Sequence, residues 1–260
     1  MLDVKHLCVT YHGGEQPFRA VDDVNFSVDA GEIFALVGGS GSGKSSIALA
    51  ITQLLPPPME ISGHALLQGR DLLSMSSEEL RAVRGGRIGY VFQEPSSSLN
   101  PVMTIGEQLA EVIECHTSVK ESAITQHAVE WLERVGIERA KERLRAYPHE
   151  FSGGMQQRVM LAMALAAKPS LLIADEPTTA LDVTVQVQLL RLLRTLQREL
   201  QLSIVLISHD LLIVERVATR MGVLSLGRLV EIGPVAQVLQ HPTHAATQEL
   251  IRARALLRLP

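Results

Sequence analysis

Residues 38–46 read GGSGSGKSS, and they directly follow the apolar run IFALV at residues 33–37. All of these residues except Lys44 are glycine or serine. Because so few apolar atoms cannot form part of a core, the stretch must be a loop. The run before it predicts a buried strand, and SSIALAITQLL at residues 45–55 predicts a helix. The sequence therefore predicts a strand, a glycine-rich loop and a helix in direct succession.

The loop carries the residue types that bind phosphate groups. It matches G-x-x-x-x-G-K-[ST] from Gly38 to Ser45 without a mismatch. Its glycines let backbone N–H groups turn toward an anion, and the helix N-terminus adds a partial positive charge. Lys44 would reach the β- and γ-phosphates, and the Ser45 hydroxyl would bind Mg²⁺. We expect a nucleoside triphosphate to contact Gly38, Gly39, Ser40, Gly41, Ser42, Gly43, Lys44, Ser45 and Ser46.

The composition argues against several classes of protein. The net charge of −4 over 260 residues gives no general attraction to nucleic acid. Cys8 and Cys115 are too few for a disulfide framework or a four-cysteine metal site. No apolar run approaches the roughly 20 residues of a membrane span, and the N-terminus lacks a signal-peptide pattern. We therefore expect a chain that stays in the cytoplasm.

A second motif supplies two carboxylates. The stretch PSLLIADEP at residues 169–177 reads as a buried strand that ends at Asp175 and Glu176. Ligands of parallel sheets bind at the C-terminal ends of strands, so Asp175 is placed to hold Mg²⁺ through water. Glu176 is placed to act as general base on the attacking water. A further buried strand, QLSIVLISHD at residues 201–210, brings His209 to the same kind of position.

One stretch separates this chain from other proteins that have a phosphate-binding loop. Residues 151–182 read FSGGMQQRVMLAMALAAKPSLLIADEPTTALD and resemble the signature region of the ATP-binding cassette (ABC) family. Ser152 to Gln156 resemble the signature sequence itself, although Met155 stands where the family most often has glutamine. Thr178 to Asp182 resemble the D-loop of that family. Three further positions fit: Gln93 resembles the Q-loop glutamine, His209 the H-loop histidine, and Tyr11 the aromatic residue that stacks on adenine.

The resemblance implies ATP and Mg²⁺ as cofactors and gives each residue an expected role. Hydrolysis would involve Glu176, His209, Lys44 and Gln93. The metal would lie near Ser45, Gln93 and Asp175. Beside the loop residues, the nucleotide would contact Tyr11, Ser152, Gly153, Gly154, Gln156 and Asp182.

The resemblance also implies partners. The signature glycines begin an apolar helix, which makes a second anion-binding helix end. The family uses both ends in a head-to-tail dimer, so we expect a second, homologous ATPase subunit. We also expect two integral-membrane permease subunits, indirect action with a substrate-binding protein, and a peripheral location on the cytoplasmic face of the inner cell membrane. Two other classes are alternatives: exporters, and soluble cassette proteins that act on nucleic acid or ribosomes. The sequence shows neither the long coiled coils nor the zinc-binding cysteines that are usual in the soluble class.

The cargo is less strongly indicated. YPHEF at residues 147–151 and QEPSSSLNPVMTIGEQL at residues 93–109 resemble the dipeptide, oligopeptide and nickel importers, and the chain resembles their D-type ATPase subunit. Peptide-type members usually extend further and carry C-terminal cysteines, which are missing here. The sequence therefore predicts uptake of nickel or a nickel chelate, with import of dipeptides or oligopeptides as the alternative.

We expect an α/β fold of the P-loop NTPase type: a parallel-sheet core, an antiparallel β subdomain and an inserted helical subdomain. The core would comprise residues 1–93 and 161–235, the helical signature subdomain residues 94–160, and a short C-terminal tail residues 236–260. Within the antiparallel layer of residues 1–35, VDDVNFSVDAGE reads as a hairpin. The last ten residues of the tail, IRARALLRLP at residues 251–260, have an apolar and a basic face, and we expect them to dock on the core rather than on lipid.

Overall fold

The computed structural model describes residues 1–13, 16–179 and 181–256. The chain forms two compact units, one from Met1–Leu80 and Ser203–Pro260, the other from Arg81–Leu202. These units differ from the domains expected from the sequence, in which residues 94–160 alone form the helical signature subdomain. The expected domain boundaries stay a prediction. Among the described helices, none combines the length and the hydropathy needed to cross a bilayer.

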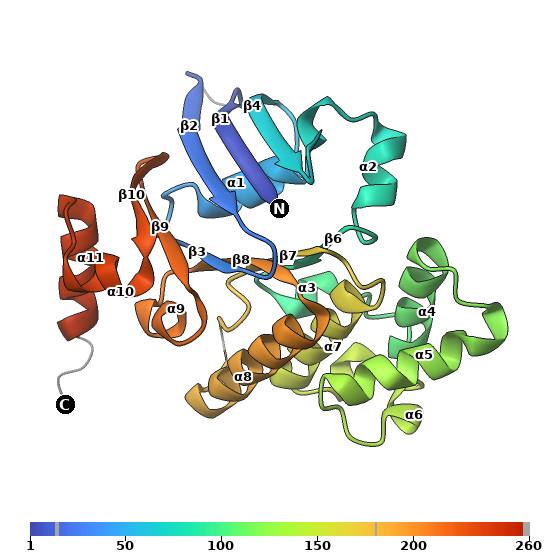
Figure 1. The fold of residues 1–260 in the computed structure, drawn as a ribbon. Helices are drawn as coiled ribbons and strands as arrows, with labels where there is room; N and C mark the ends of the chain where they lie inside the picture. Colours follow the sequence, from blue (N-terminus) through green and yellow to red (C-terminus); the bar gives the residue numbers. More distant parts are fainter. Residues whose placement is uncertain (14–15, 180, 257–260) are drawn as a thin grey trace. The chain divides into compact units, whose positions relative to one another are not determined.

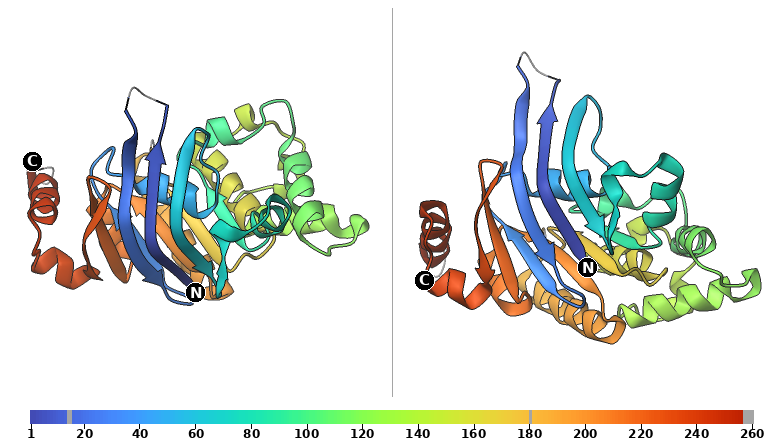
Figure 2. Two further views of the ribbon diagram at one scale, coloured as in Figure 1. Left: turned by 90° about the horizontal axis from the view of Figure 1, so that it is seen from above. Right: turned by 45° about the horizontal axis from the view of Figure 1, so that its top comes forward.

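An antiparallel sheet with the strand order β2-β1-β4-β5 forms part of the first unit (Figures 1 and 2). Its strands are β1 (Leu2–Tyr11), β2 (Phe18–Val28), β4 (Met59–Leu67) and β5 (Arg70–Asp71). The expected hairpin in VDDVNFSVDAGE is wrong, because Phe18–Val28 is one continuous strand. Asp23 adopts a left-handed backbone (φ 52°), and the register against β1 shifts nearby, so the pair of aspartates forms an irregularity inside a strand and not a turn.

Buried strands lie beside this sheet in the same unit. β3 (Ile33–Val37) pairs in parallel with β8 (Ser203–Ser208) and with β9 (Arg220–Ser225), and β10 (Arg228–Pro234) pairs antiparallel to β9. Every residue of β3 and β8 is buried, which is typical of strands covered on both faces. The helices of this unit are α1 (Lys44–Ile51), η1 (Leu72–Ser74), α9 (Leu211–Val217), α10 (Val235–Gln240) and α11 (Ala245–Leu256), while α2 (Ser77–Val83) crosses its boundary.

The C-terminal helices dock on this unit, as expected. Leu250 and Ile251 of α11 pack against a buried cluster that includes Met221 and Val223 of β9 and Val238 of α10. Figures 1 and 2 both show α10 and α11 alongside β9 and β10. These two side chains are therefore covered by the protein itself, whereas residues 257–260 lie outside the described residues.

The second unit is mainly helical. Its two strands, β6 (Ile88–Val91) and β7 (Leu171–Asp175), pair in parallel. The described part of residues 94–160 contains helices and no strand, in agreement with the helical segment expected there. The helices are α3 (Pro95–Ser98), α4 (Ile105–His116), α5 (Glu121–Arg134), α6 (Ala140–Arg143), η2 (Pro148–Glu150), α7 (Gly153–Leu165) and α8 (Val183–Leu200).

Candidate nucleotide-binding and hydrolysis site

The glycine-rich loop connects β3 to α1, as the sequence predicts. Gly41 (φ 72°) and Gly43 (φ 106°) have left-handed backbones that other residues adopt only with strain. A Cβ at Gly43 would lie 2.5 Å from the carbonyl oxygen of Ala20, so a side chain is excluded there by contact as well. The sharp turn from strand to helix therefore requires glycine at this position.

Lys44 lies in the first turn of α1 and points back into the loop. Its Nζ donates hydrogen bonds to the carbonyl oxygens of Gly38 (3.0 Å) and Gly39 (2.9 Å), and only 6% of the residue is exposed. The ammonium group therefore fixes the loop backbone and puts a positive charge where the phosphates are expected. The half-buried Ser45 lies beside it in the same turn.

Tyr11, the residue expected to stack on adenine, lies at the end of β1. Its hydroxyl is hydrogen-bonded to Ser46 Oγ at 3.2 Å, which ties the aromatic ring to α1. Next to it is a pocket of about 280 Å³, lined by Tyr11, Gly13, Gln16, Phe18, Pro56, Pro57 and Pro58. Two aromatic rings and three prolines give this pocket apolar groups of the kind that a purine base can stack on.

His209 follows β8 and has an exposed side chain in the first unit. The residue after it, Asp210, caps α9, because its Oδ1 accepts a hydrogen bond from the Leu212 N–H at 2.7 Å. This cap fixes the backbone that carries the histidine.

In the second unit, Asp175 is the last residue of β7 and only 6% exposed. The Tyr90 hydroxyl, from the neighbouring strand β6, donates a hydrogen bond to Asp175 Oδ2 at 3.3 Å. Burial, with the negative charge of Asp175 adding to it, raises the pKa of Tyr90 well above its usual range. Tyr90 therefore stays protonated at neutral pH and can donate to Asp175 there.

Glu176 has a left-handed backbone (φ 46°), which is unfavourable for a residue with a side chain. Its Oε2 accepts two hydrogen bonds, one from Gln93 Nε2 at 3.2 Å and one from Thr179 Oγ1 at 3.0 Å. The structure thus brings together two residues that the sequence places 83 positions apart and assigns to one reaction. The contacts of Tyr90 and Thr179 with the two carboxylates were not expected from the sequence, since neither residue is charged.

The signature residues lie at the start of α7. Ser152 is the N-cap, and its Oγ accepts a hydrogen bond from the Met155 N–H at 3.4 Å. Gln156 donates hydrogen bonds to the carbonyl oxygens of Pro148 (2.8 Å) and Phe151 (3.3 Å). Its amide therefore supports the loop that precedes the helix, a role that the sequence did not predict.

The D-loop residues connect β7 to α8. Asp182 caps α8 by accepting a hydrogen bond from the Val185 N–H at 3.0 Å. A Cβ at Gly154, the second residue of α7, would lie 2.7 Å from the Val185 side chain. Ala180 lies outside the described residues. The small size of Gly154 thus allows the starts of α7 and α8 to approach closely.

The expected metal fits the donors present. Mg²⁺ prefers hard oxygen ligands and usually takes one or two carboxylates together with substrate phosphates. The Ser45 hydroxyl and the Asp175 carboxylate are such donors, whereas no cysteine or histidine is among the residues expected to hold the metal. Ser45 in the first unit, and Asp175 and Gln93 in the second, each offer an oxygen of the kind that Mg²⁺ prefers.

The chain resembles known proteins along nearly its whole length. A profile of the family described as ABC transporter matches residues 21–179. The oligopeptide transport ATP-binding protein OppD of Bacillus subtilis (strain 168) is 47% identical over 99% of this chain and 72% of its own length. The peptidoglycan transport ATP-binding protein YejF of Agrobacterium fabrum is 49% identical over 97% of this chain, which spans 47% of that protein.

A solved structure shows the same fold. It is the dimeric post-hydrolysis state of the ATP-binding cassette MJ0796 bound to ADP and Pi, with a TM-score of 0.80 and 29% identity over 90% of this chain and 99% of that one. The fold, the sequence identity and the strand–loop–helix that begins at β3 all indicate the same family. The chain belongs to the ABC transporter family and is one of its ATP-hydrolysing subunits.

Proposed function

We propose that this chain powers the import of oligopeptides as the ATPase subunit of an ABC importer. The observation that carries the proposal is the 47% identity, across 99% of the chain, to a protein named for oligopeptide transport. A second OppD, from Haemophilus influenzae, is 46% identical over 94% of the chain. Identity at this level over the whole chain is expected of subunits that fit similar partners.

The expected nickel cargo is less well supported than its alternative. The relatives reported above are named for oligopeptide and peptidoglycan transport. The expectation of nickel rested on the shorter C-terminal segment and its lack of cysteines, which is an argument from one segment outside the ATPase site. Nickel therefore enters the experiment below as the competing cargo.

The proposed reaction is ATP hydrolysis. The backbone N–H groups of residues 38–43 and the Lys44 ammonium bind the phosphates, while Tyr11 stacks on the base. Glu176 accepts a proton from the attacking water, and Gln93 and His209 donate hydrogen bonds to the water and the γ-phosphate. Mg²⁺ supplies positive charge that offsets the charge developing on the phosphate oxygens.

The proposed assembly follows from the two helix ends. The signature helix α7 starts with Ser152 and two glycines, whose N–H groups suit the γ-phosphate of a nucleotide held by another subunit. A relative with the same fold is described as dimeric. We therefore propose a head-to-tail dimer with a homologous ATPase subunit, attached to two permease subunits on the cytoplasmic side of the membrane.

The test is uptake by cells that carry the chain in wild-type form or as Glu176→Gln or Lys44→Ala. Labelled oligopeptide, labelled nickel and nickel with a chelator are offered separately. We expect both variants to lose oligopeptide uptake and to keep nickel uptake. Loss of nickel uptake with normal oligopeptide uptake would overturn the proposed cargo, and no loss of either would overturn the importer role.

A further inference from the structure

The glycine-rich loop rests on the turn between β9 and β10. The Gly227 N–H donates a hydrogen bond to the carbonyl oxygen of Ser42, at 3.0 Å. At the start of the loop, Gly38 lies so close to the carbonyl oxygen of Leu224 in β9 that a Cβ could not be placed between them. The position of the loop backbone therefore depends on the position of this turn.

The turn itself is short and strained. Ser225 pairs with Arg228, so Leu226 and Gly227 are its two central residues, and both have left-handed backbones (φ 48° and 79°). This is the two-residue hairpin that suits asparagine or glycine, yet the first position holds leucine. The Leu226 side chain is 91% exposed and gains nothing from packing. Contacts elsewhere must therefore keep the turn in place.

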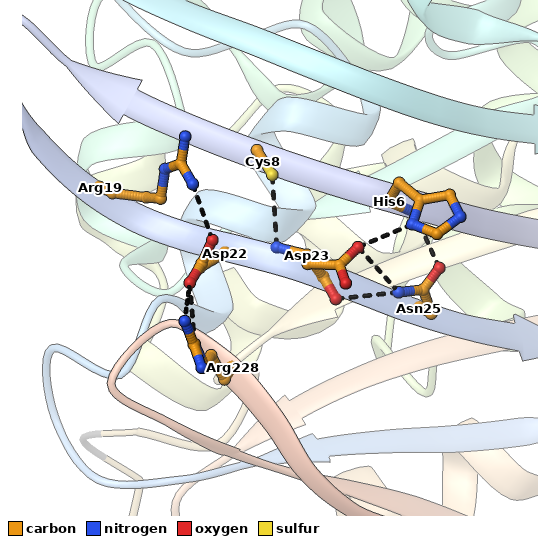
Figure 3. Close-up of polar contacts among 7 residues, drawn as sticks. All are labelled: His6, Cys8, Arg19, Asp22, Asp23, Asn25 and Arg228. Carbon is orange, nitrogen blue, oxygen red and sulfur yellow. Dashed lines mark hydrogen bonds and ion pairs between the residues drawn. The ribbon is translucent and has the colours of Figure 1, made fainter.

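Those contacts come from β2. The Asp22 N–H donates to the carbonyl oxygen of Gly227 at 2.9 Å. Arg228, the residue after the turn, contacts Asp22 Oδ2 through Nη2 at 2.6 Å and through Nε at 2.8 Å. Figure 3 shows this pair, with Arg19 bound to the other carboxylate oxygen of Asp22 at 2.9 Å. The aspartate thus fixes the turn through its backbone and its side chain together.

We propose that Asp22 and Arg228 are positioning residues for nucleotide binding, which hold the β9–β10 turn against Ser42 and so keep the glycine-rich loop in its phosphate-binding shape. The inference rests on the proposed role of this loop. Binding is tighter when a site is already in its bound shape, because less conformational freedom is lost. The guanidinium groups of Arg228 and Arg19 lower the pKa of Asp22, so the carboxylate is charged throughout the neutral range.

The test compares the affinity of Arg228→Gln and the wild type for a fluorescent ATP analogue, with and without Mg²⁺. Losing a partly exposed ion pair is expected to raise the Kd about two- to fivefold, with kcat at saturating ATP unchanged. Arg228→Lys should recover part of the affinity. Because salt screens exposed charges, the difference in Kd should shrink at high ionic strength.

The matched control is Arg70→Gln. Arg70 forms a similar exposed ion pair with Glu79, at 3.2 Å in the same unit, but it has no contact with the turn or the loop in the described contacts. This variant should bind the analogue as the wild type does. If Arg228→Gln lowers only the melting temperature and leaves the Kd unchanged, the residue is merely structural and the inference is wrong.

A double variant tests whether the two residues act as one unit. Asp22→Asn and Arg228→Gln together should weaken binding about as much as the stronger single variant, since they remove the same pair. Additive losses would contradict the inference. A wild-type chain that binds no nucleotide would overturn the proposed function as well, so the two failures can be told apart.

Discussion

Glu176 is the residue on which ATP hydrolysis depends in the proposed mechanism. Glu176→Gln keeps the size of the side chain and a carbonyl oxygen that can still accept from Gln93 and Thr179, but an amide cannot take a proton from water. We expect ATP binding close to that of the wild type and hydrolysis slowed by at least about 100-fold. Single-turnover hydrolysis and nucleotide retention measure the two effects.

The control for this variant is Glu199→Gln, which removes a carboxylate that pairs only loosely with Arg134, at 3.6 Å. Its hydrolysis rate should stay normal. Hydrolysis by Glu176→Gln at the wild-type rate would show that another group accepts the proton.

In the proposed mechanism, Tyr90 would affect the same reaction through its hydrogen bond to Asp175. Tyr90→Phe removes the hydroxyl that donates to the Asp175 carboxylate and leaves the ring, which packs on Phe92 with centroids 4.3 Å apart. Because groups bonded to metal ligands tune metal affinity, we expect Mn²⁺ to bind the ATP complex about tenfold more weakly. Electron paramagnetic resonance of Mn²⁺ gives that affinity directly.

Tyr147→Phe is the matched control, since Tyr147 is exposed, its ring stacks on His149, and none of its described contacts involves Asp175 or Glu176. Equal Mn²⁺ affinity in Tyr90→Phe and the wild type would mean that the hydrogen bond to Asp175 has no effect on the metal.

At the scale of elements, the junction of β3, the loop and α1 makes the sharpest demand on sequence. Gly43→Ala would place a methyl group against the Ala20 carbonyl oxygen in a left-handed backbone, and we expect it to lower the free energy of unfolding by about 1–3 kcal/mol. Gly39→Ala meets nothing within 4 Å and should leave the stability nearly unchanged. Urea unfolding gives the free energy of unfolding of both variants. Equal losses of stability would show that the loop backbone shifts to accommodate a methyl group at Gly43.

Elements with a local pattern could be predicted from the sequence. The loop between β3 and α1 and the strand that ends at Asp175 follow from residue order alone, because strand, glycines and helix are consecutive. The hairpin expected within β2 failed, because Asp22 and Asp23 read as a turn when their partners are unknown. Those partners, His6 and Arg228, lie in other strands and let the aspartates stay inside β2.

The partners of the site residues were harder to predict for the same reason. Gln156 stands in a motif, so a ligand was expected, but its amide is used by Pro148 and Phe151. Thr179 and Tyr90 contact the two carboxylates only after folding. Motifs therefore predict which groups react, whereas the neighbours of those groups depend on tertiary contacts.

For the whole molecule, ATP should act as a stabilising ligand. A ligand that binds only the folded chain adds about 2.7 kcal/mol to the free energy of unfolding at one hundred times its Kd. We expect ATP with Mg²⁺ to raise the melting temperature of the wild type and to leave that of Lys44→Ala unchanged, since this lysine both shapes the loop and neutralises phosphate. Differential scanning fluorimetry measures the shift in melting temperature. An equal shift in the wild type and in Lys44→Ala would mean that ATP binds at a site that does not depend on Lys44.

The left-handed backbone of Glu176 has a consequence for evolution. A side chain in this conformation costs roughly 1 kcal/mol or more, and glycine would avoid that cost. If Glu176 is the general base of the proposed mechanism, a laboratory selection for heat resistance alone would favour its replacement by glycine, and the more stable chains would hydrolyse ATP more slowly. Heat resistance and turnover would then pull this one position in opposite directions.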